Sequence, residues 1–187
     1  MRKVLLGAAV LVSATVFSAP AMAAGFTNGD FETGSLSSWT ATGNLAAYSN
    51  TGIPVPADWG TTRVAAIGVA TLSQTFDTVA NTVYKIGYTI ESDGGPGSVA
   101  VDFGGTTNTG GTTVAGDTFT SHFFYATATG ATTTLNFGLN NNSYFNLDNI
   151  TVTAVPEAGT WAMLLIGFGA AGVTMRSRRR AAKVTYA

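Results

Sequence analysis

The chain has 187 residues, of which 45% are apolar but only 10% are charged, so it has room for one domain of common size. It contains no cysteine, which excludes disulfide bonds, thiolate nucleophiles and Cys-ligated metal sites. One histidine, His122, excludes multi-histidine metal centres, and a formal net charge of −1 does not favour nucleic acid as a partner.

The small net charge hides three blocks of different sign. Residues 1–24 carry +2 and residues 155–187 carry +4, whereas residues 25–154 hold two basic against nine acidic residues, a formal charge of −7. The chain is therefore an acidic body between two basic ends, and both ends have the character of trafficking signals.

The N-terminal segment has the three parts of a secretory signal peptide. Arg2 and Lys3 precede a short apolar run over residues 4–12, and small residues follow up to the Ala-Met-Ala of residues 21–23. We expect residues 1–23 to direct export through the Sec translocon, with cleavage after Ala23 or Ala24. An uncleaved membrane anchor is the alternative, although the apolar run is short for one.

The central segment alternates apolar and polar residues in short runs separated by Gly or Asn, without helical periodicity. About eight such strands with turn residues between them predict an all-β fold, an antiparallel β-sandwich over residues 24–154. Low-complexity disorder is the rival interpretation of the Thr and Gly richness, and the alternating aromatic residues argue against it. The clearest predicted strands are 72–76, 84–90, 99–103, 119–125, 135–139 and 144–152.

Two acidic sites stand at opposite ends of this body. The alternation slips at Asp148-Asn149, which predicts a β-bulge that turns Asp148 away from its strand. Near the start, Glu32 lies in the acidic stretch 28–39, and first and last strands of a sandwich often lie side by side. Glu32 and Asp148 could then share a Ca²⁺ ion, or else be a solvated glutamate and a turn-capping aspartate; the residues alone leave the two interpretations equal.

Three segments of the body resemble secreted carbohydrate-binding-module-like domains, which have the galactose-binding-like jelly-roll fold. They are NGDFETGSLSSW at residues 28–39, LSQTF at 72–76 and YFNLDNITV at 144–152. The resemblance implies a jelly roll with a structural calcium held by Glu32 and Asp148, with Asp58 as the nearest candidate for a third ligand. The ion would hold the sheet edges together and would not catalyse.

Sugar binding needs exposed aromatic faces and polar side chains that bond hydroxyl groups. The candidate stacking residues are Trp39, Tyr48, Trp59, Tyr125 and Tyr144, and the candidate hydrogen-bonding residues are Arg63, Asn140, Asn141 and Asn142. Trp59 is the best candidate for exposure because it lies in the proline-rich loop 53–60. Core packing is the more common role for each aromatic residue of a small domain.

The C-terminal segment has an uncharged run of fifteen residues, 161–175, followed at once by an arginine cluster. A helix over 159–175 would be about 25 Å long. With bilayer thinning it could cross a membrane, leaving the basic residues in the cytoplasm. We therefore expect a transmembrane helix here and a short cytoplasmic tail over 181–187.

Residues 155–180 resemble a PEP-CTERM sorting signal of the PEP-x-x-W-A variant. The residues that carry the resemblance are Pro156, Glu157, Trp161, Ala162, Gly167, Gly169, Arg178, Arg179 and Arg180. It implies a substrate of exosortase, a membrane-embedded transpeptidase that cuts near the motif, in a Gram-negative bacterium. Ala158 replaces the second proline of the motif, which puts recognition in doubt, and a permanent tail anchor is the alternative.

Catalysis is not expected, because the nine acids of the body form no recognisable pair and His122 lies in the middle of a predicted strand. We expect a non-catalytic exported protein, anchored in the inner membrane until processed and then located at the cell surface or in the matrix, where it binds or associates with exopolysaccharide. The alternative is a structural or adhesive surface protein without a sugar site, retained by its membrane anchor.

Overall fold

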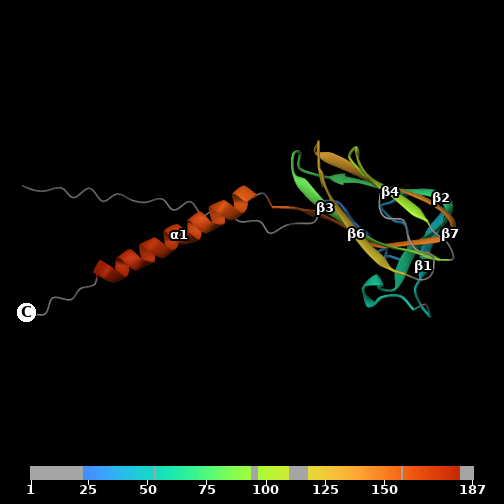
Figure 1. The fold of residues 1–187 in the computed structure, drawn as a ribbon, viewed down its shortest axis with the longest axis horizontal. Helices are drawn as coiled ribbons and strands as arrows, with labels where there is room; N and C mark the ends of the chain where they lie inside the picture. The colour runs from blue at the N-terminus through green and yellow to red at the C-terminus, as the bar shows by residue number, and fades with distance from the viewer. Residues whose placement is uncertain (1–22, 53, 94–96, 110–117, 157, 182–187) are drawn as a thin grey trace, which may run out of the picture.

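The computed structural model describes residues 23–52, 54–93, 97–109, 118–156 and 158–181. A curved β-domain is followed by one helix that projects away from it (Figure 1). The predicted all-β, antiparallel body is thus confirmed. Its strands are β1 (Thr40–Ser49), β2 (Thr62–Asp77), β3 (Val83–Asp93), β4 (Ser98–Phe103), β5 (Thr106–Thr109), β6 (Thr120–Thr127) and β7 (Thr132–Ala154), and a short 3₁₀ turn η1 (Ala57–Trp59) precedes β2.

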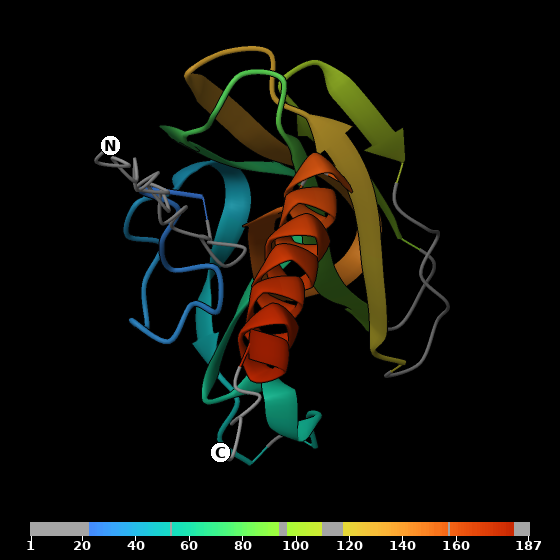
Figure 2. The same ribbon diagram turned by 90° about the vertical axis from the view of Figure 1, so that its left-hand side faces the viewer.

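All strand pairs are antiparallel and form one sheet in the order β1-β2-β7-β3-β6, with β4 and β5 added beside β7. The first half of β7 pairs with β4 and the end of β2, and its second half pairs with β3 and the start of β2. Register shifts at Gly43 in β1 and Gly68 in β2 bend the sheet between these halves. The sheet therefore curves back on itself into a near-barrel (Figure 2).

The strand β7 differs from the sequence prediction of two strands, 135–139 and 144–152. The structure has one strand of 23 residues, because pairing with different partners on either side continues it through the polar residues 140–143. The core lies inside the curved sheet, where the alternate residues of each strand meet. Its largest fully buried apolar side chains include Phe31, Leu72, Ile86, Ile90, Phe103, Leu135, Phe137, Leu139, Phe145 and Leu147.

Residues 23–39 close the sheet on the side of β7 that β2 leaves unpaired. Ala23 N–H donates to the carbonyl of Val152 (3.1 Å), and Ile150 N–H donates to the carbonyl of Gly29 (2.8 Å). A Cβ on Gly29 would collide with the Ile150 carbonyl, so glycine permits this close approach. The segment thereby carries the acidic residues at 30 and 32 to the beginning of β2.

The C-terminal helix α1 (Ala158–Ala181) is present where a helix was predicted. Its exposed large apolar residues include Leu165, Ile166 and Phe168. Within the part of the chain that the structure describes, no helix is long and apolar enough to cross a membrane. This finding differs from the expectation of a transmembrane helix. The uncharged run is shorter than the roughly 20 apolar residues of a usual span, and its glycines lower the hydropathy further.

Candidate functional site

A groove lies on the outer face of the sheet, across β1, β2, β7 and β3. Its cavity of about 210 Å³ is lined by Tyr48, Arg63, Ala65, Asp93, Tyr144 and Asn146. The strand register brings these residues together: Tyr48 pairs with Arg63, Ala65 with Asn146, and Tyr144 with Asp93. We call these residues, with Glu91, the tyrosine groove.

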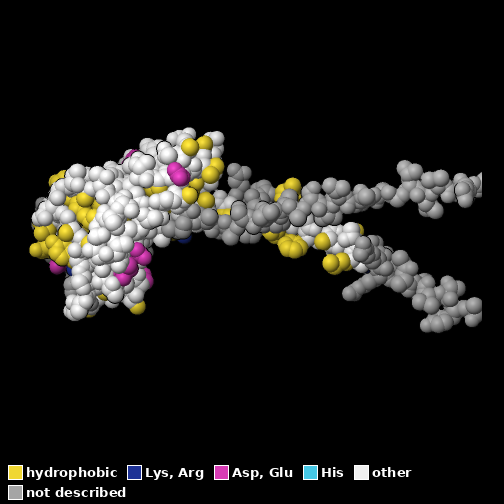
Figure 3. All heavy atoms as spheres, turned by 180° about the vertical axis from the view of Figure 1, so that it is seen from behind, with side chains coloured by type: hydrophobic (Ala, Val, Ile, Leu, Met, Phe, Trp, Pro, Cys, Tyr) yellow, Lys and Arg dark blue, Asp and Glu magenta, His cyan; other side chains and the backbone are white. Residues whose placement is uncertain are grey.

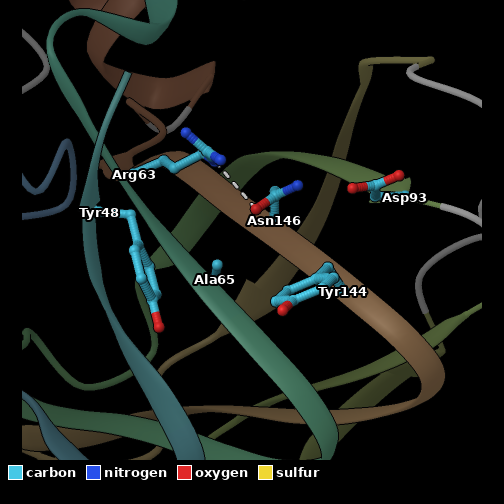
Figure 4. A pocket seen from close by; sticks show the side chains of 6 residues that line it. All are labelled: Tyr48, Arg63, Ala65, Asp93, Tyr144 and Asn146. Atoms are coloured by element: carbon cyan, nitrogen blue, oxygen red, sulfur yellow. Dashed lines mark hydrogen bonds between the residues drawn. The ribbon is translucent and has the colours of Figure 1, made fainter. Parts of the chain in front are cut away.

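The two tyrosines form the sides of the groove. Tyr48 is 47% exposed and Tyr144 is 48% exposed, so about half of each side chain stays accessible to a ligand. Figure 4 shows the small side chain of Ala65 between the two rings, which leaves the floor between them open. Aromatic walls over an open floor are suited to the apolar faces of sugar rings.

A chain of hydrogen bonds crosses three strands along the groove. The Nε of Arg63 donates to Asn146 Oδ1 (2.9 Å), and the Nδ2 of Asn146 donates to Glu91 Oε2 (Figure 4 shows the first bond). Arg63 Nη1 also donates to Asn50 Oδ1 (2.7 Å). Because Asn146 bonds through both ends of its amide, it fixes the arginine and the buried glutamate relative to each other.

A second cavity of about 130 Å³ adjoins the first, because Arg63, Asp93 and Asn146 line both. Its other lining residues are Pro54 and Val55 in the loop before η1, Glu91 on β3 and Phe119 just before β6. The two cavities give the tyrosine groove an extended shape rather than that of a closed pocket for one sugar.

The structure places the predicted sugar-binding residues in different parts of the domain. Tyr48 lies in the tyrosine groove, whereas Asn140 is exposed on β7 beside β4 and does not line it. The interpretation of Trp59 as an exposed loop residue is wrong: it is 1% exposed and packs edge-on against Phe119, with ring centroids 4.6 Å apart. The loop folds back on the sheet and buries its aromatic ring. The side chain of Asn142 is outside the described part of the chain.

Three polar residues of the groove were not among the predicted site residues: Glu91, Asp93 and Asn146. Glu91 and Asp93 occupy alternate positions of β3, opposite to the buried apolar set that contains Ile90. That alternation could have assigned both carboxylates to the outer face. Asn146 lies 55 residues from Glu91, and only the pairing of β3 with β7 brings them together.

A second polar region, which we call the acidic corner, surrounds Asp148 on β7. The predicted bulge is present here, because the register of β3 and β7 shifts between Gly87 and Thr89 and Asn149 has a φ of 52°. Asp148 is completely buried. Its Oδ1 accepts from Asn149 N–H (2.7 Å), and its Oδ2 has no hydrogen-bond partner among the residues that the structure describes.

The electrostatic surroundings of Asp148 are unfavourable to a bare carboxylate. Burial raises its pKa to about 8; the Asn149 N–H opposes this, and repulsion from Glu32, Asp30 and Asp58 adds to it. Such a group favours either a proton or a bound cation. Glu32 and Asp148, which lie near opposite ends of the domain's sequence, are therefore close enough for the charge of Glu32 to raise the pKa of Asp148.

Glu32 is held at the start of β2 by three donors. Thr61 Oγ1 donates to Oε2 (2.5 Å), while the N–H groups of Thr61 and Thr62 donate to Oε1 (2.7 and 2.9 Å). The Thr61 hydroxyl is the main cause that lowers the pKa of Glu32, with the two N–H groups adding to it against desolvation. Gly60 has a φ of +57°, and a Cβ there would collide with Glu32 Oε1. This glycine therefore allows the carboxylate to approach the backbone.

Asp58 is exposed on η1. Among the described residues, no three His, Cys, Asp or Glu side chains are grouped so that they alone could hold a metal ion. A cation in the acidic corner would therefore need backbone carbonyl or water ligands besides the carboxylates of Asp148 and Glu32.

The predicted sorting residues lie in α1 and just before it. Pro156 precedes the helix, and Ala162, Gly167 and Gly169 are exposed on it. Glu157 is outside the described residues, as are the side chains of Trp161, Arg178, Arg179 and Arg180.

Known proteins resemble this chain in two regions, the C-terminal segment and the β-domain. Residues 154–180 match the PEP-CTERM protein-sorting motif, which implies an exported protein anchored transiently in the membrane. No curated protein sequence matches the chain.

Solved structures resemble the β-domain. TmCBM61 in complex with β-1,4-galactotriose has a TM-score of 0.55 and 16% identity over 68% of this chain and 95% of its own. The CBM22-1 xylan-binding domain of Paenibacillus barcinonensis Xyn10C has a TM-score of 0.51 and 16% identity over 68% and 92%. The enzymatically active domain of bacteriophage CBA120 tailspike protein 4 has a TM-score of 0.51 and 14% identity, over 70% of this chain but 21% of its own. The chain thus joins a β-domain with a jelly-roll fold, similar to the fold of these carbohydrate-binding modules, to a PEP-CTERM sorting motif.

Proposed function

We propose that this protein is a non-catalytic, exported polysaccharide-binding protein that uses the tyrosine groove as its binding site. The observation that carries the proposal is the pair of half-exposed rings, Tyr48 and Tyr144, on either side of Ala65 (Figure 4). The bonded chain Arg63–Asn146–Glu91 lies beside them. The jelly-roll fold and the sorting motif support a sugar-binding role outside the cytoplasm. We propose that the protein binds the exopolysaccharide of the producing cell after export.

The groove has the two kinds of contact that a sugar chain requires. The tyrosine rings stack on the apolar faces of pyranose rings, and the fixed polar groups of Arg63 and Asn146 bond to hydroxyl groups. Because these polar groups are already held by one another, little side-chain entropy is lost when the ligand binds. The open, extended shape suits an internal stretch of a polysaccharide.

The test is binding of the full-length protein, in mild detergent, to β-1,4-galactan, xylan and bacterial exopolysaccharides. Tyr48→Ala and Tyr144→Ala should each weaken binding by roughly fivefold, about 1 kcal/mol for a lost aromatic contact. Tyr125→Ala is the matched control, since Tyr125 is 55% exposed on β6 but does not line the groove. Failure of a folded protein to bind any polysaccharide would favour the alternative, a structural or adhesive surface protein.

We also propose that a calcium ion binds in the acidic corner, held by Asp148 and Glu32 with backbone oxygens, and that it has a structural role. The supporting observation is the fully buried Asp148 Oδ2, an acceptor without a donor in acidic surroundings. A divalent cation would satisfy this oxygen and offset the repulsion among the carboxylates. Asp58 lies near enough to raise the pKa of Asp148 and could contribute through water.

Calcium binding should appear as a stability change. At a hundredfold excess of Ca²⁺ over its Kd, the free energy of unfolding should rise by about 2.7 kcal/mol relative to EDTA. Thermal unfolding with and without Ca²⁺ measures this, and Asp148→Asn should abolish the response. Asp77→Asn, at the far end of β2, is the control that should retain it. An unchanged midpoint of the native protein in the two solutions would disprove the calcium site.

For the tail, we propose that exosortase removes α1 after export, guided by the motif around Pro156. The match over residues 154–180 supports this. Mass spectrometry of the mature surface protein should find a C-terminus near residue 156. Recovery of the intact segment 161–175 from that protein would contradict processing and favour a permanent anchor.

A further inference from the structure

Exposed apolar side chains of the β-domain gather at the end where the chain leaves for α1. Among the residues that the structure describes, eight large apolar side chains of this domain are exposed, and two of them are the groove tyrosines. Four others lie near the exit of the chain: Val79, Val83, Phe123 and Tyr125. Phe123 and Tyr125 are 60% and 55% exposed, more than either groove tyrosine. A cluster of exposed apolar side chains marks a contact surface.

Strand pairing places these side chains on one outer face. On β3, Val83 and Lys85 flank the buried Tyr84 and so point away from the core. Lys85 pairs with Tyr125 of β6. The rings of Phe123 and Tyr125 meet edge-on with centroids 5.9 Å apart, and Lys85 Nζ lies 4.6 Å from the centroid of the Phe123 ring. We call the five residues of this surface the exit patch: Val79, Val83, Lys85, Phe123 and Tyr125.

The exit patch adjoins the last residues of the β-domain. Val155 N–H donates to the carbonyl of Val83 (2.8 Å), and Ala154 lines a cavity of about 260 Å³ together with Val79. The helix α1 begins at Ala158, three chain steps later, which span at most about 11 Å. Figure 1 shows the chain leaving the domain beside β3 and β6. Any surface that holds α1 is therefore within reach of the patch.

The sorting motif indicates which surface this is. The match over residues 154–180 includes nearly all of α1 and implies that the exported protein is anchored transiently in the membrane. Exposed aromatic rings are typical of the layer between lipid and water. A lysine suits the same layer, because its stem covers apolar surface while its ammonium group stays in water. The exit patch combines both, with Lys85 as one of the two basic residues of segment 25–154.

The charge of the domain restricts the lipid that suits the patch. Segment 25–154 carries −7, and on the face shown in Figure 3 acidic surface is more extensive than basic surface. Asp77 lines the same cavity as Val79, so an acid adjoins the patch as well as Lys85. An anionic membrane would repel such a domain. The favourable contact is therefore burial of apolar and aromatic surface in zwitterionic lipid.

We propose that the exit patch docks the β-domain on the membrane surface while the tail anchors the protein. The rings of Phe123 and Tyr125 lie among the lipid headgroups in this state. The tyrosine groove stays clear of the bilayer, because Asp93, which lines it, is eight residues from Lys85 on β3, roughly 25 Å along an extended strand. The inference concerns a surface apart from the groove and does not depend on sugar binding.

A single spin label can report on docking, because the chain has no cysteine of its own. Thr127→Cys puts the label at the edge of the patch, opposite Val83, and Thr51→Cys puts it on the exposed turn after β1. The full-length protein is reconstituted in vesicles of phosphatidylcholine and phosphatidylethanolamine. Electron paramagnetic resonance then measures how often each label collides with oxygen, which dissolves in lipid, and with a water-soluble nickel complex, which does not. The label at 127 should meet oxygen more often and nickel less often than the label at 51.

Variants assign the docking to the patch. Phe123→Ser and Tyr125→Ser should each lower the ratio of docked to undocked protein by about tenfold, as for one large apolar side chain removed from water. Val69→Ser is the matched control, because Val69 is 72% exposed on β2, where it pairs with Asn140, and should leave docking unchanged.

Three results would overturn the inference. The first is a label at 127 that meets the nickel complex as often as the label at 51. The second is a label at 127 shielded from oxygen and nickel together, because that indicates contact with protein, such as a second copy of the chain. The third is a full-length protein that does not float with the vesicles. All three leave the proposed function of the groove intact, since polysaccharide binding is measured separately.

Discussion

The tyrosine groove and the acidic corner contain residues that lie two positions apart on β7, Asn146 and Asp148. The polar groups of the groove are hydrogen-bonded to one another, whereas those of the corner are not fully bonded. Asn146 bonds through both ends of its amide, to Arg63 and to Glu91. Asp148 is completely buried, and one of its carboxylate oxygens has no donor within the described part of the chain. A region whose polar groups bond to one another is built before a ligand arrives and can be optional for folding. A region with a buried, unbonded carboxylate is incomplete until a proton or cation binds.

The largest expected effect is on the pH dependence of stability, and it tests whether the acidic corner needs a bound proton or cation. In EDTA, the stability of the native protein should fall as the pH rises from about 4 toward about 8. The reason is that the raised pKa of Asp148 favours the protonated acid in the folded state, against an ordinary value of 3.8. This contribution is fully present below the ordinary pKa and is lost as the pH passes through the raised one, with a slope of up to about 1.4 kcal/mol per pH unit.

Denaturant unfolding across this pH range, in EDTA, measures the slope. Glu32 has the opposite shift and gains stability as the pH rises through its ordinary range near 4.5, so the decline should be clearest above that range. Asp148→Asn should flatten the profile, and Asp77→Asn should not. If the stability of the native protein rose toward pH 8 in EDTA, Asp148 would ionise inside the fold without lowering the free energy of unfolding. The acidic corner would then differ from the groove in no energetic respect.

The second prediction concerns the groove. Asn146→Ala should lower the free energy of unfolding by about 1–3 kcal/mol, because Glu91, only 2% exposed, loses the amide that donates to it. The same variant should weaken polysaccharide binding, since Arg63 loses a fixed partner. Chemical denaturation and calorimetry give the two numbers. Asn44→Ala, an exposed asparagine of β1, is the control for both.

If Asn146→Ala weakened binding without any change in stability, the hydrogen-bond chain would not hold the groove together. Binding unaffected by the loss of Asn146 would show instead that the tyrosines alone define the site. Either result would remove the distinction between a prebuilt groove and an incomplete corner.

The sequence predicted the acidic corner better than the groove, and the reason is physical. The bulge at Asp148-Asn149 is local, because a shift in alternation is visible within one strand. The closeness of Glu32 followed from the expectation that the first and last strands adjoin. The first strand, β1, pairs with β2 instead, but the segment 23–39 before it lies beside β7 and brings Glu32 there. Both inferences used short segments and one general rule of sandwich topology.

The groove depends on pairing between distant strands, which alternation alone does not give. Tyr48 and Tyr144 were both predicted as candidate stacking residues, but only the pairing of β1, β2 and β7 places them on the two sides of Ala65. Trp59 was misassigned because proline and glycine around it indicate a loop, and a loop that folds onto the sheet can bury its ring. The β1 strand was missed for a related reason: its Ala, Thr and Gly residues have little apolar alternation.

The smallest expected effect is the loss of stability when a glycine near the acidic corner is replaced by alanine. Two glycines help to distinguish backbone strain from a clash with the Glu32 side chain. Gly60 and Gly52 both have positive φ, +57° and +80°, but a Cβ would meet Glu32 at Gly60 and nothing within 4 Å at Gly52. Gly52→Ala should lose about 1 kcal/mol because of its positive φ. Gly60→Ala should lose at least as much from the backbone, because a φ of 57° with a ψ of −140° lies in a region that residues with a Cβ rarely adopt. Gly60→Ala should lose about 1 kcal/mol more, because the methyl group displaces the Glu32 carboxylate from Thr61 and Thr62. Gly60→Ala should also weaken the response to Ca²⁺, whereas Gly52→Ala should not. Equal losses in the two variants would mean that Glu32 moves aside freely, and that its three hydrogen bonds add little to the stability of the corner.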